Sequence, residues 1–201
     1  MAKPQDKLTL DVRSQIVEAA HSRFRHYGYG KTTMVEIAAD NDMSAANLYR
    51  YFKNKQEIIA ECANRCMCER VDCLRTAIRQ PELSAIERLK TYVLSDLQFS
   101  HEMAENDVKI NELVNTITLE RPDLVYRKIE AEHALIAEIL SHGNETGEFD
   151  INDIIATART IHTSLVVFNV PIFMSLYSLE QFQEKAASMV ELLVNGLAKR
   201  H

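Results

Sequence analysis

Side chains that suit contact with a nucleic acid gather between Thr32 and Lys55. Asn47 can pair with base edges, and Arg50 can pair with guanine or with phosphate. Hydroxyl, phenol and ammonium groups nearby suit phosphate contacts, which set the register of a protein on DNA without reading sequence. Two alanines would let the backbone approach closely. The predicted DNA-contacting set is Thr32, Thr33, Ser44, Ala45, Ala46, Asn47, Tyr49, Arg50, Tyr51 and Lys55.

Two short helices joined by a tight turn are predicted to position these side chains. Thr33 and Glu36 have the spacing of a capping box. Asn41-Asp42-Met43 suits the turn, since Asn and Asp tolerate a left-handed backbone. Ser44 then caps the second helix, whose Leu48 and Phe52 share one inward face. The pattern predicts a helix-turn-helix over residues 33–52, with a plain helical hairpin of half-buried tyrosines as the alternative.

The stretch from Ile16 to about Ile58 closely resembles the DNA-binding domain of the TetR family of bacterial transcriptional regulators. The matching positions are Ile16, Ala19-Ala20, Phe24, Gly28-Tyr29, Thr32-Thr33, Ile37-Ala38, Ser44, Leu48-Tyr49-Arg50-Tyr51-Phe52 and Lys55. Two departures concern the DNA-facing part. The family usually has Ala-Gly where this chain has Asn41-Asp42, and it often has a basic residue near Ala45 or Ala46. Base readout is therefore expected mainly from Asn47 and Arg50.

Charge is distributed unevenly along the 201 residues. Residues 1–60 hold nine Lys or Arg and seven Asp or Glu, which gives a net charge of +2. Because the whole chain has a net charge of −6, residues 61–201 have a net charge of −8. The basic part coincides with the predicted helix-turn-helix, and the acidic part would be repelled by DNA. The sequence shows no signal peptide and no apolar run long enough to span a bilayer, so a cytoplasmic protein without membrane contact is expected.

Helical periodicity dominates the chain, and strand alternation is not evident, so the predicted fold class is all-α. We expect a mobile arm over residues 1–9, a three-helix DNA-binding domain over 10–56, and a larger helical domain for effector binding and dimerisation over 57–201. The first helix should begin near Thr9. Gly143 and Gly147 indicate a loop, and Pro171 is expected to kink a helix that begins near Ile154.

The resemblance implies a homodimer formed through the last two helices, and the excess of apolar residues there is consistent with it. The residues predicted at this interface are Ile161, Leu165, Met189, Leu193 and Leu197, with packing inside the monomer as the alternative. A cavity for a small, largely apolar effector is predicted from Phe99, Met103, Leu113, Tyr126, His162, Phe168, Phe173 and Met174, each of which could equally be a core residue.

Four cysteines, Cys62, Cys66, Cys68 and Cys73, lie on one predicted helix. A redox or metal sensor is one interpretation, but their spacing does not match paired C-x2-C zinc sites. Free thiols used as small apolar residues are the other. No metal or other cofactor is expected.

The predicted function is a ligand-responsive repressor that binds a pseudo-palindromic operator in double-stranded DNA and leaves it when the effector binds. A helical adaptor without DNA binding, or a regulator that uses the cysteines, is the alternative. An enzyme is not expected, because the sequence shows no catalytic triad pattern, phosphate loop or nucleotide fingerprint.

Overall fold

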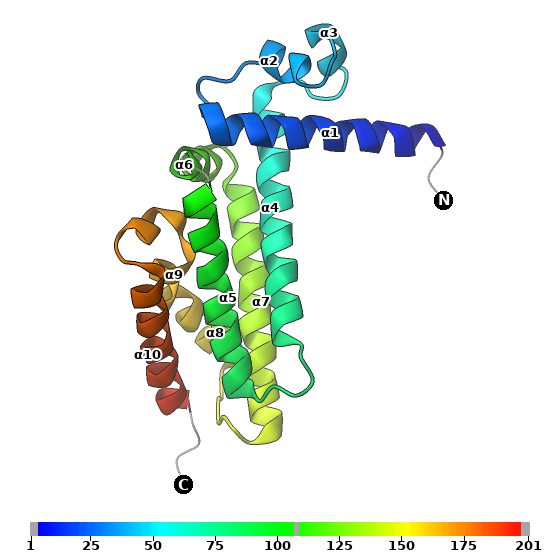
Figure 1. The fold of residues 1–201 in the computed structure, drawn as a ribbon. Helices are drawn as coiled ribbons and strands as arrows, with labels where there is room; N and C mark the ends of the chain where they lie inside the picture. Colours follow the sequence, from blue (N-terminus) through cyan, green and yellow to red (C-terminus); the bar gives the residue numbers. More distant parts are fainter. Residues whose placement is uncertain (1–3, 107–108, 198–201) are drawn as a thin grey trace. The chain divides into compact units, whose positions relative to one another are not determined.

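The computed structural model describes the backbone of residues 4–106 and 109–197, and every regular element within those ranges is helical (Figure 1). The all-α fold class is therefore confirmed. The elements are α1 (Pro4–Tyr27), α2 (Met34–Ala39), α3 (Ala45–Leu48), α4 (Lys55–Ile78), α5 (Ala85–Asn106), α6 (Ile110–Glu120), α7 (Pro122–Thr146), α8 (Ile154–Ser164), α9 (Val166–Asn169), the 3-10 helix η1 (Pro171–Ser175) and α10 (Leu179–Leu197).

The chain folds into two compact units whose division differs from the expected one at residue 56. The first unit contains α1, α2, α3, the first part of α4 and also α6. The second contains α4 from Cys68 onward, α5, α7 from Tyr126, and the elements that follow. Helix α4 is thus shared by the two units. Helix α6 belongs to the first unit, although its neighbours in sequence belong mainly to the second.

The core of the first unit contains apolar residues that recur every four positions along its helices. Ile16, Ala20 and Phe24 of α1 are fully buried, as are Leu48 and Phe52. Ile117 of α6 joins the same cluster. Helix α1 begins at Pro4, so residues 4–9 are helical and not part of a separate arm, because proline suits the first turn of a helix. Residues 1–3 of the expected arm lie outside the described residues.

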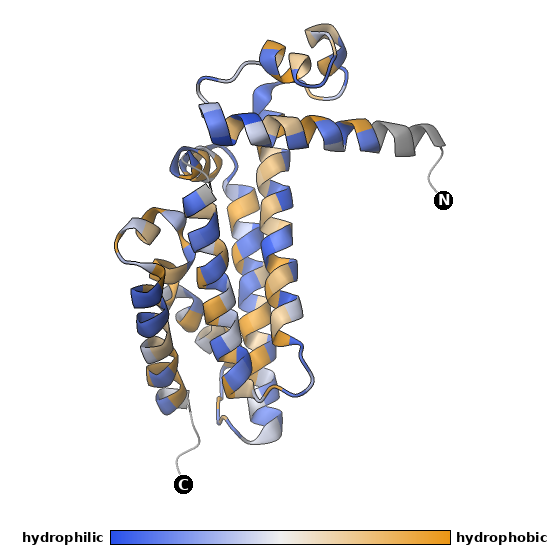
Figure 2. Cartoon of the chain, viewed as in Figure 1, coloured by the Kyte–Doolittle hydropathy of each residue, from blue (hydrophilic) through white to orange (hydrophobic). Residues whose placement is uncertain are grey.

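The core of the second unit is formed by α4, α5, α7, α8, α9 and α10. Helix α5 packs against α9, η1 and α10. Hydrophobic and hydrophilic residues are interleaved along the long helices, as expected for helices that bury one face (Figure 2). Among the described residues, none of the helices has both the length and the apolar character that a membrane span requires.

Two features of the second unit differ from expectation. Gly143 is helical and buried, and a Cβ placed on it would lie 2.0 Å from the ring of Phe149. This glycine admits an aromatic ring, and the end of α7 is set by Gly147, whose φ is +78°. Instead of one helix kinked at Pro171, the chain forms α8, α9 and η1, and Pro171 opens η1 because it lacks a backbone N–H.

Candidate DNA interface and a buried polar network

The entry to α2 is fixed by the capping box that the sequence predicted. The Glu36 amide donates to the Thr33 hydroxyl at 3.3 Å, and the Glu36 carboxylate accepts from the Thr33 amide at 2.8 Å. The Thr33 hydroxyl also donates to the Glu36 carboxylate at 2.8 Å, and this hydrogen bond together with that of the Thr33 amide lowers the pKa of Glu36. The turn after α2 places Asp42 at φ 52°, a left-handed conformation that aspartate tolerates better than most residues. The predicted turn chemistry is confirmed.

The short helix α3 is followed directly by two exposed side chains, Tyr49 and Arg50. Ser44 caps it, because its hydroxyl accepts a hydrogen bond from the Asn47 amide at 3.2 Å. Leu48 is its buried residue, whereas Tyr49 is 53% exposed and Arg50 is exposed. Asn47, which is predicted to read a base edge, is partly buried.

The remaining members of the predicted DNA-contacting set are distributed between surface and core. Ala46 and Thr33 are exposed, Ala45 is partly buried, and Tyr51 packs partly buried against the core of the unit. The carbonyl of Tyr51 also accepts a hydrogen bond from Arg13. The exposed members of the predicted set are Thr33, Ser44, Ala46, Tyr49 and Arg50, and these are the residues most accessible to DNA.

Lys55 and Thr32, both predicted to contact phosphate, use their polar atoms inside the unit. The Lys55 ammonium donates to the carbonyls of Tyr29 and Thr32 at 2.6 and 2.7 Å and lies 4.3 Å from the ring centroid of Tyr29. Burial lowers the pKa of Lys55. Thr32 is 1% exposed, and its hydroxyl donates to the carbonyl of Gly28 at 2.9 Å. Both residues thus hold the turn before α2, and their contact with DNA stays a prediction.

The acidic charge near the interface is partly neutralised by α1. Arg23 donates to both carboxylate oxygens of Asp40, at 2.5 and 2.9 Å, and lies 3.4 Å from the Glu36 carboxylate. The Arg23 hydrogen bond lowers the pKa of Asp40, so this carboxylate stays ionised and paired. Asp42 remains exposed.

A contact that sequence reasoning missed ties α6 to the turn before α2. The Glu112 carboxylate accepts a hydrogen bond from the Gly30 amide at 2.7 Å. A Cβ on Gly28 would lie 2.8 Å from the same carboxylate, and Gly28 has a φ of +90°. The two glycines therefore leave room for the carboxylate. The Gly28-Tyr29 part of the family pattern was the available signal, but nothing in the local sequence indicated its partner.

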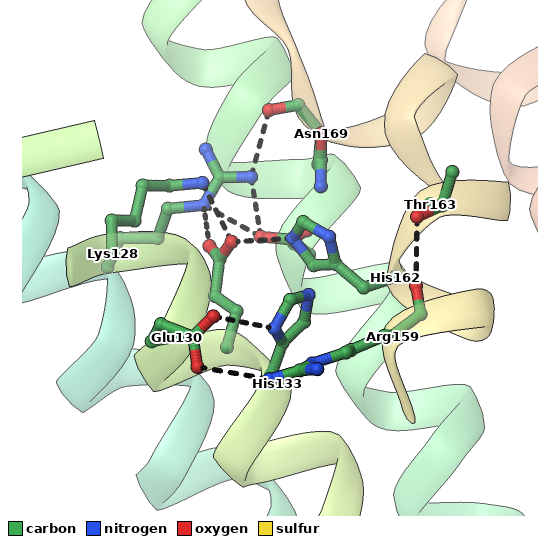
Figure 3. A network of polar contacts seen from close by, with 10 residues as sticks. Lys128, Glu130, His133, Arg159, His162, Thr163 and Asn169 are labelled. Carbon is green, nitrogen blue, oxygen red and sulfur yellow. Dashed lines mark hydrogen bonds and ion pairs between the residues drawn. The ribbon is translucent and has the colours of Figure 1, made fainter. Parts of the chain in front are cut away.

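The second unit contains a buried polar network centred on Arg70, which also escaped the sequence analysis (Figure 3). Arg70 is 4% exposed and donates to Asp96 at 2.7 Å and to the carbonyl of Asn169 at 3.0 Å. Although burial opposes its charge, Asp96 and Glu132 raise the pKa of Arg70. This arginine of α4 is thus held by α5, α7 and α9.

Glu132 receives three cationic or hydrogen-bonding groups within the same network. Lys128 donates to it at 2.8 Å, the His162 ring nitrogen lies 3.0 Å from it, and Arg70 lies 3.4 Å away. Although burial acts in the opposite direction, the hydrogen bond of His162 and the charges of Lys128 and Arg70 lower the pKa of Glu132 to about 2. We call Arg70, Asp96, Lys128, Glu132 and His162 the Arg70 network.

The residues predicted to line an effector cavity do not form a single cluster. Leu113 packs against the core of the first unit, and Tyr126 is 68% exposed. His162 belongs to the Arg70 network, and the Phe99 ring lies 5.3 Å from the Arg70 guanidinium. The others are core or partly buried residues of the second unit, namely Met103, Phe168, Phe173 and Met174.

Two residues predicted at the dimer interface, Ile161 and Leu165, are each 2% exposed and lie in the core of the second unit. Their apolar surface is already covered within one chain, so the prediction is not supported for them. Met189 and Leu193 are partly buried, and the side chain of Leu197 lies outside the described residues.

The four cysteines, all within the described residues, are not in disulfides and lie in different environments. Cys62 is buried, and burial raises the pKa of its thiol to about 12. Cys66 is partly buried, whereas Cys68 and Cys73 are exposed. Within the described part of the chain, no three His, Cys, Asp or Glu side chains are grouped so as to hold a metal ion.

Residues 16–62 match the family model described as "Bacterial regulatory proteins, tetR family", and residues 85–190 match "Tetracyclin repressor-like, C-terminal domain". The second match alone covers just over half of the chain. The chain belongs to the TetR family. TetR-family proteins are DNA-binding transcriptional regulators and not enzymes, and their members dimerise and bind small-molecule effectors.

Comparison with individual proteins is consistent with this assignment to the TetR family. The uncharacterized HTH-type transcriptional regulator YhgD of Bacillus subtilis is 26% identical over 137 residues, covering 64% of this chain and 71% of YhgD. A transcriptional regulator from Cytophaga hutchinsonii has the same fold, with a TM-score of 0.72, 21% identity, and coverage of 92% of this chain and 98% of its own. The fatty acid degradation regulator FadR from Bacillus halodurans gives a TM-score of 0.66, 23% identity and full coverage of both chains.

Proposed function

We propose that the protein represses transcription by binding a pseudo-palindromic operator through α3 and leaves the operator when a small, largely apolar effector binds. The observation that carries the proposal is the exposure of Tyr49 and Arg50 directly after the Ser44-capped helix α3, with Asn47 of that helix partly exposed. Arginine and asparagine are the side chains that most often read base edges in the major groove. A helix with one buried residue spends little of its surface on the core.

A second copy of the chain is the partner that supports such a short recognition helix. Major-groove readers of this kind gain affinity by binding two half-sites about one helical turn apart. The last elements of the second unit expose large apolar side chains, which we assign to the interface in place of Ile161 and Leu165. These are Ile155, Val166, Ile172, Leu176, Tyr177 and Leu192.

The proposal is tested by selecting binding sites from a random duplex library with the full chain and measuring their affinity by fluorescence anisotropy. We expect a two-part, inverted-repeat sequence, a stoichiometry of two chains per site, and affinity that falls steeply with salt. Binding that shows neither sequence preference nor salt dependence would instead support a helical adaptor. A change of operator affinity on oxidation alone would favour regulation through Cys68 and Cys73.

A further inference from the structure

Three polar side chains are buried along one face of α5. Tyr92, Asp96 and Ser100 are spaced by four residues, so they lie one above the other on the helix. Their exposed fractions are 1%, 3% and 0%. Polar groups this deeply buried are expected to be hydrogen-bonded, since an unpaired one costs its full desolvation free energy. Asp96 meets this expectation through Arg70.

The hydroxyls of Tyr92 and Ser100, one turn before and one turn after Asp96, depart from the expectation that buried polar groups are hydrogen-bonded. Neither the Tyr92 hydroxyl nor the Ser100 hydroxyl has a hydrogen-bond partner among the described residues. Several helical hydroxyls of the chain donate to the carbonyl four residues earlier, as in Thr76, Thr160 and Ser188, and the Ser100 hydroxyl does not. Because Ser100 is fully buried and lacks this local bond, its hydroxyl is available to a group other than the described residues.

The free hydroxyl of Tyr92 lies beside the Arg70 network. Its phenol is within electrostatic reach of Asp96, Glu132 and Arg70. Glu132 adds acceptor capacity, because its Oε1 is buried without a hydrogen bond and its cationic neighbour, Arg70 Nε, is 3.4 Å away. Helices α5 and α7 thus each contribute a buried polar atom without a hydrogen bond beside the Arg70 guanidinium.

The charges of the network determine what kind of group could join it. Arg70 and Lys128 balance Asp96 and Glu132, so an additional charge would be buried without a counter-ion. A neutral group that both donates and accepts hydrogen bonds meets no such cost. The neighbouring apolar side chains, among them Phe99 above Arg70, suit a hydrophobic or aromatic body.

We propose that the Tyr92–Asp96–Ser100 face of α5 binds the neutral, hydrogen-bonding end of a small apolar effector. The inference rests on the proposed function, since it names the chemical class of the effector and the residues that recognise its polar end. The competing explanation is that ordered water permanently hydrogen-bonds to the two hydroxyls. The two explanations predict different changes in the unfolding temperature of the ligand-free protein when a hydroxyl is removed.

The first arm of the test compares thermal unfolding of Tyr92→Phe and Ser100→Ala with wild type, in the absence of any ligand. If the hydroxyls await an effector, each variant unfolds at the same temperature as wild type or higher, because an unsatisfied buried group has been removed. If water satisfies them, both variants unfold at a lower temperature and the proposal is wrong. Ser188→Ala is the matched control, because its exposed hydroxyl already has a partner.

The second arm uses three probes with one ring and different head groups: benzyl alcohol, benzoate and benzylammonium. Binding to the full chain is measured by saturation-transfer NMR, with dissociation constants from titration. We expect benzyl alcohol to bind most tightly, and its affinity to fall about fivefold in Tyr92→Phe and in Ser100→Ala but not in Ser188→Ala. Preference for a charged probe, equal binding by all variants, or no binding of any probe would overturn the proposal.

Operator affinity of the same variants without probe separates this proposal from the proposed function. Tyr92→Phe and Ser100→Ala are expected to bind the selected operator as wild type does, because both residues lie in the second unit. Normal operator binding with an indifferent response to the probes would refute the effector site alone. If the wild-type protein binds no operator at all, the proposed repressor function is wrong.

Discussion

The carboxylate of Glu112 in α6 accepts a hydrogen bond from the backbone amide of Gly30, 82 residues earlier, at 2.7 Å. Gly30 belongs to the turn that leads into α2, and the turn is also held by the Lys55 ammonium. Chain segments on both sides of α6 belong to the second unit. Glu112 is therefore placed to set the position of α2, and through it the exposed face of α3.

Replacing Glu112 by Ala should weaken operator binding about three- to tenfold, because a charge-assisted hydrogen bond to the turn is lost. Glu112→Gln should retain part of the affinity, since the amide oxygen can still accept from Gly30. Asn111→Ala, a change at the exposed neighbouring residue, is the matched control. Fluorescence anisotropy with the selected operator checks this, and identical affinities for Glu112→Ala and Asn111→Ala would contradict it.

Removing the Lys55 ammonium should affect folding more than DNA contact. Lys55→Met keeps the aliphatic stem but loses the hydrogen bonds to Tyr29 and Thr32, so the free energy of unfolding should fall by about 1–3 kcal/mol. Urea unfolding measures the loss, with Gln56→Ala as an exposed control on the same turn. The slope of operator affinity against salt should stay as in wild type. A slope reduced by about one would mean that Lys55 neutralises a phosphate after all.

The Arg70 network should make the free energy of unfolding decrease as the pH falls below about 5. The pKa of Glu132 falls from its ordinary value of 4.5 to about 2 in the folded protein. Its contribution to stability is therefore complete above about pH 5 and is lost as the pH falls from there toward 2.

Unfolding in urea at several pH values isolates this contribution when wild type is compared with Glu132→Gln. The difference in unfolding free energy should shrink steadily below pH 5. Glu130→Gln, at an exposed position on the same helix, serves as the control. A difference that stays constant from pH 6 to pH 3 would show that folding does not lower the pKa of Glu132.

The two helical glycines of the second unit should respond to alanine in opposite directions. Gly143→Ala places a Cβ 2.0 Å from the Phe149 ring and should destabilise the protein by about 1–3 kcal/mol through overpacking. Gly196→Ala meets nothing within 4 Å and should be neutral or stabilising, by up to about 1 kcal/mol, because alanine favours helices. Urea unfolding of both variants checks this, and a destabilising Gly196→Ala would argue against the helical end of α10.

Features determined by residues close in sequence could be predicted, and contacts between distant segments could not. The capping box of Thr33 and Glu36 and the shared inward face of Leu48 and Phe52 follow from spacings of three and four residues. The Arg70–Asp96 pair and the Arg70–Asn169 bond join residues 26 and 99 positions apart, so neither residue's local pattern indicates the other.

The role of an individual residue was hardest to predict where two functions fit the same side chain. Lys55 has the charge for a phosphate and Gly143 the flexibility for a loop, but tertiary contacts give them other roles. The buried positions of Ile161 and Leu165 have the same cause, since an apolar stripe can face the chain's own core or a second copy.

The central claim, that α3 and the exposed residues directly after it read DNA, is tested most directly by Arg50→Ala. The control is Lys90→Ala, which removes one exposed positive charge from the second unit. Operator affinity and its ratio to random-duplex affinity are measured by anisotropy for both variants. The account predicts that Arg50→Ala loses about 1–3 kcal/mol of operator binding and part of its sequence preference, while Lys90→Ala keeps both. Equal affinity and equal preference in the two variants would contradict it.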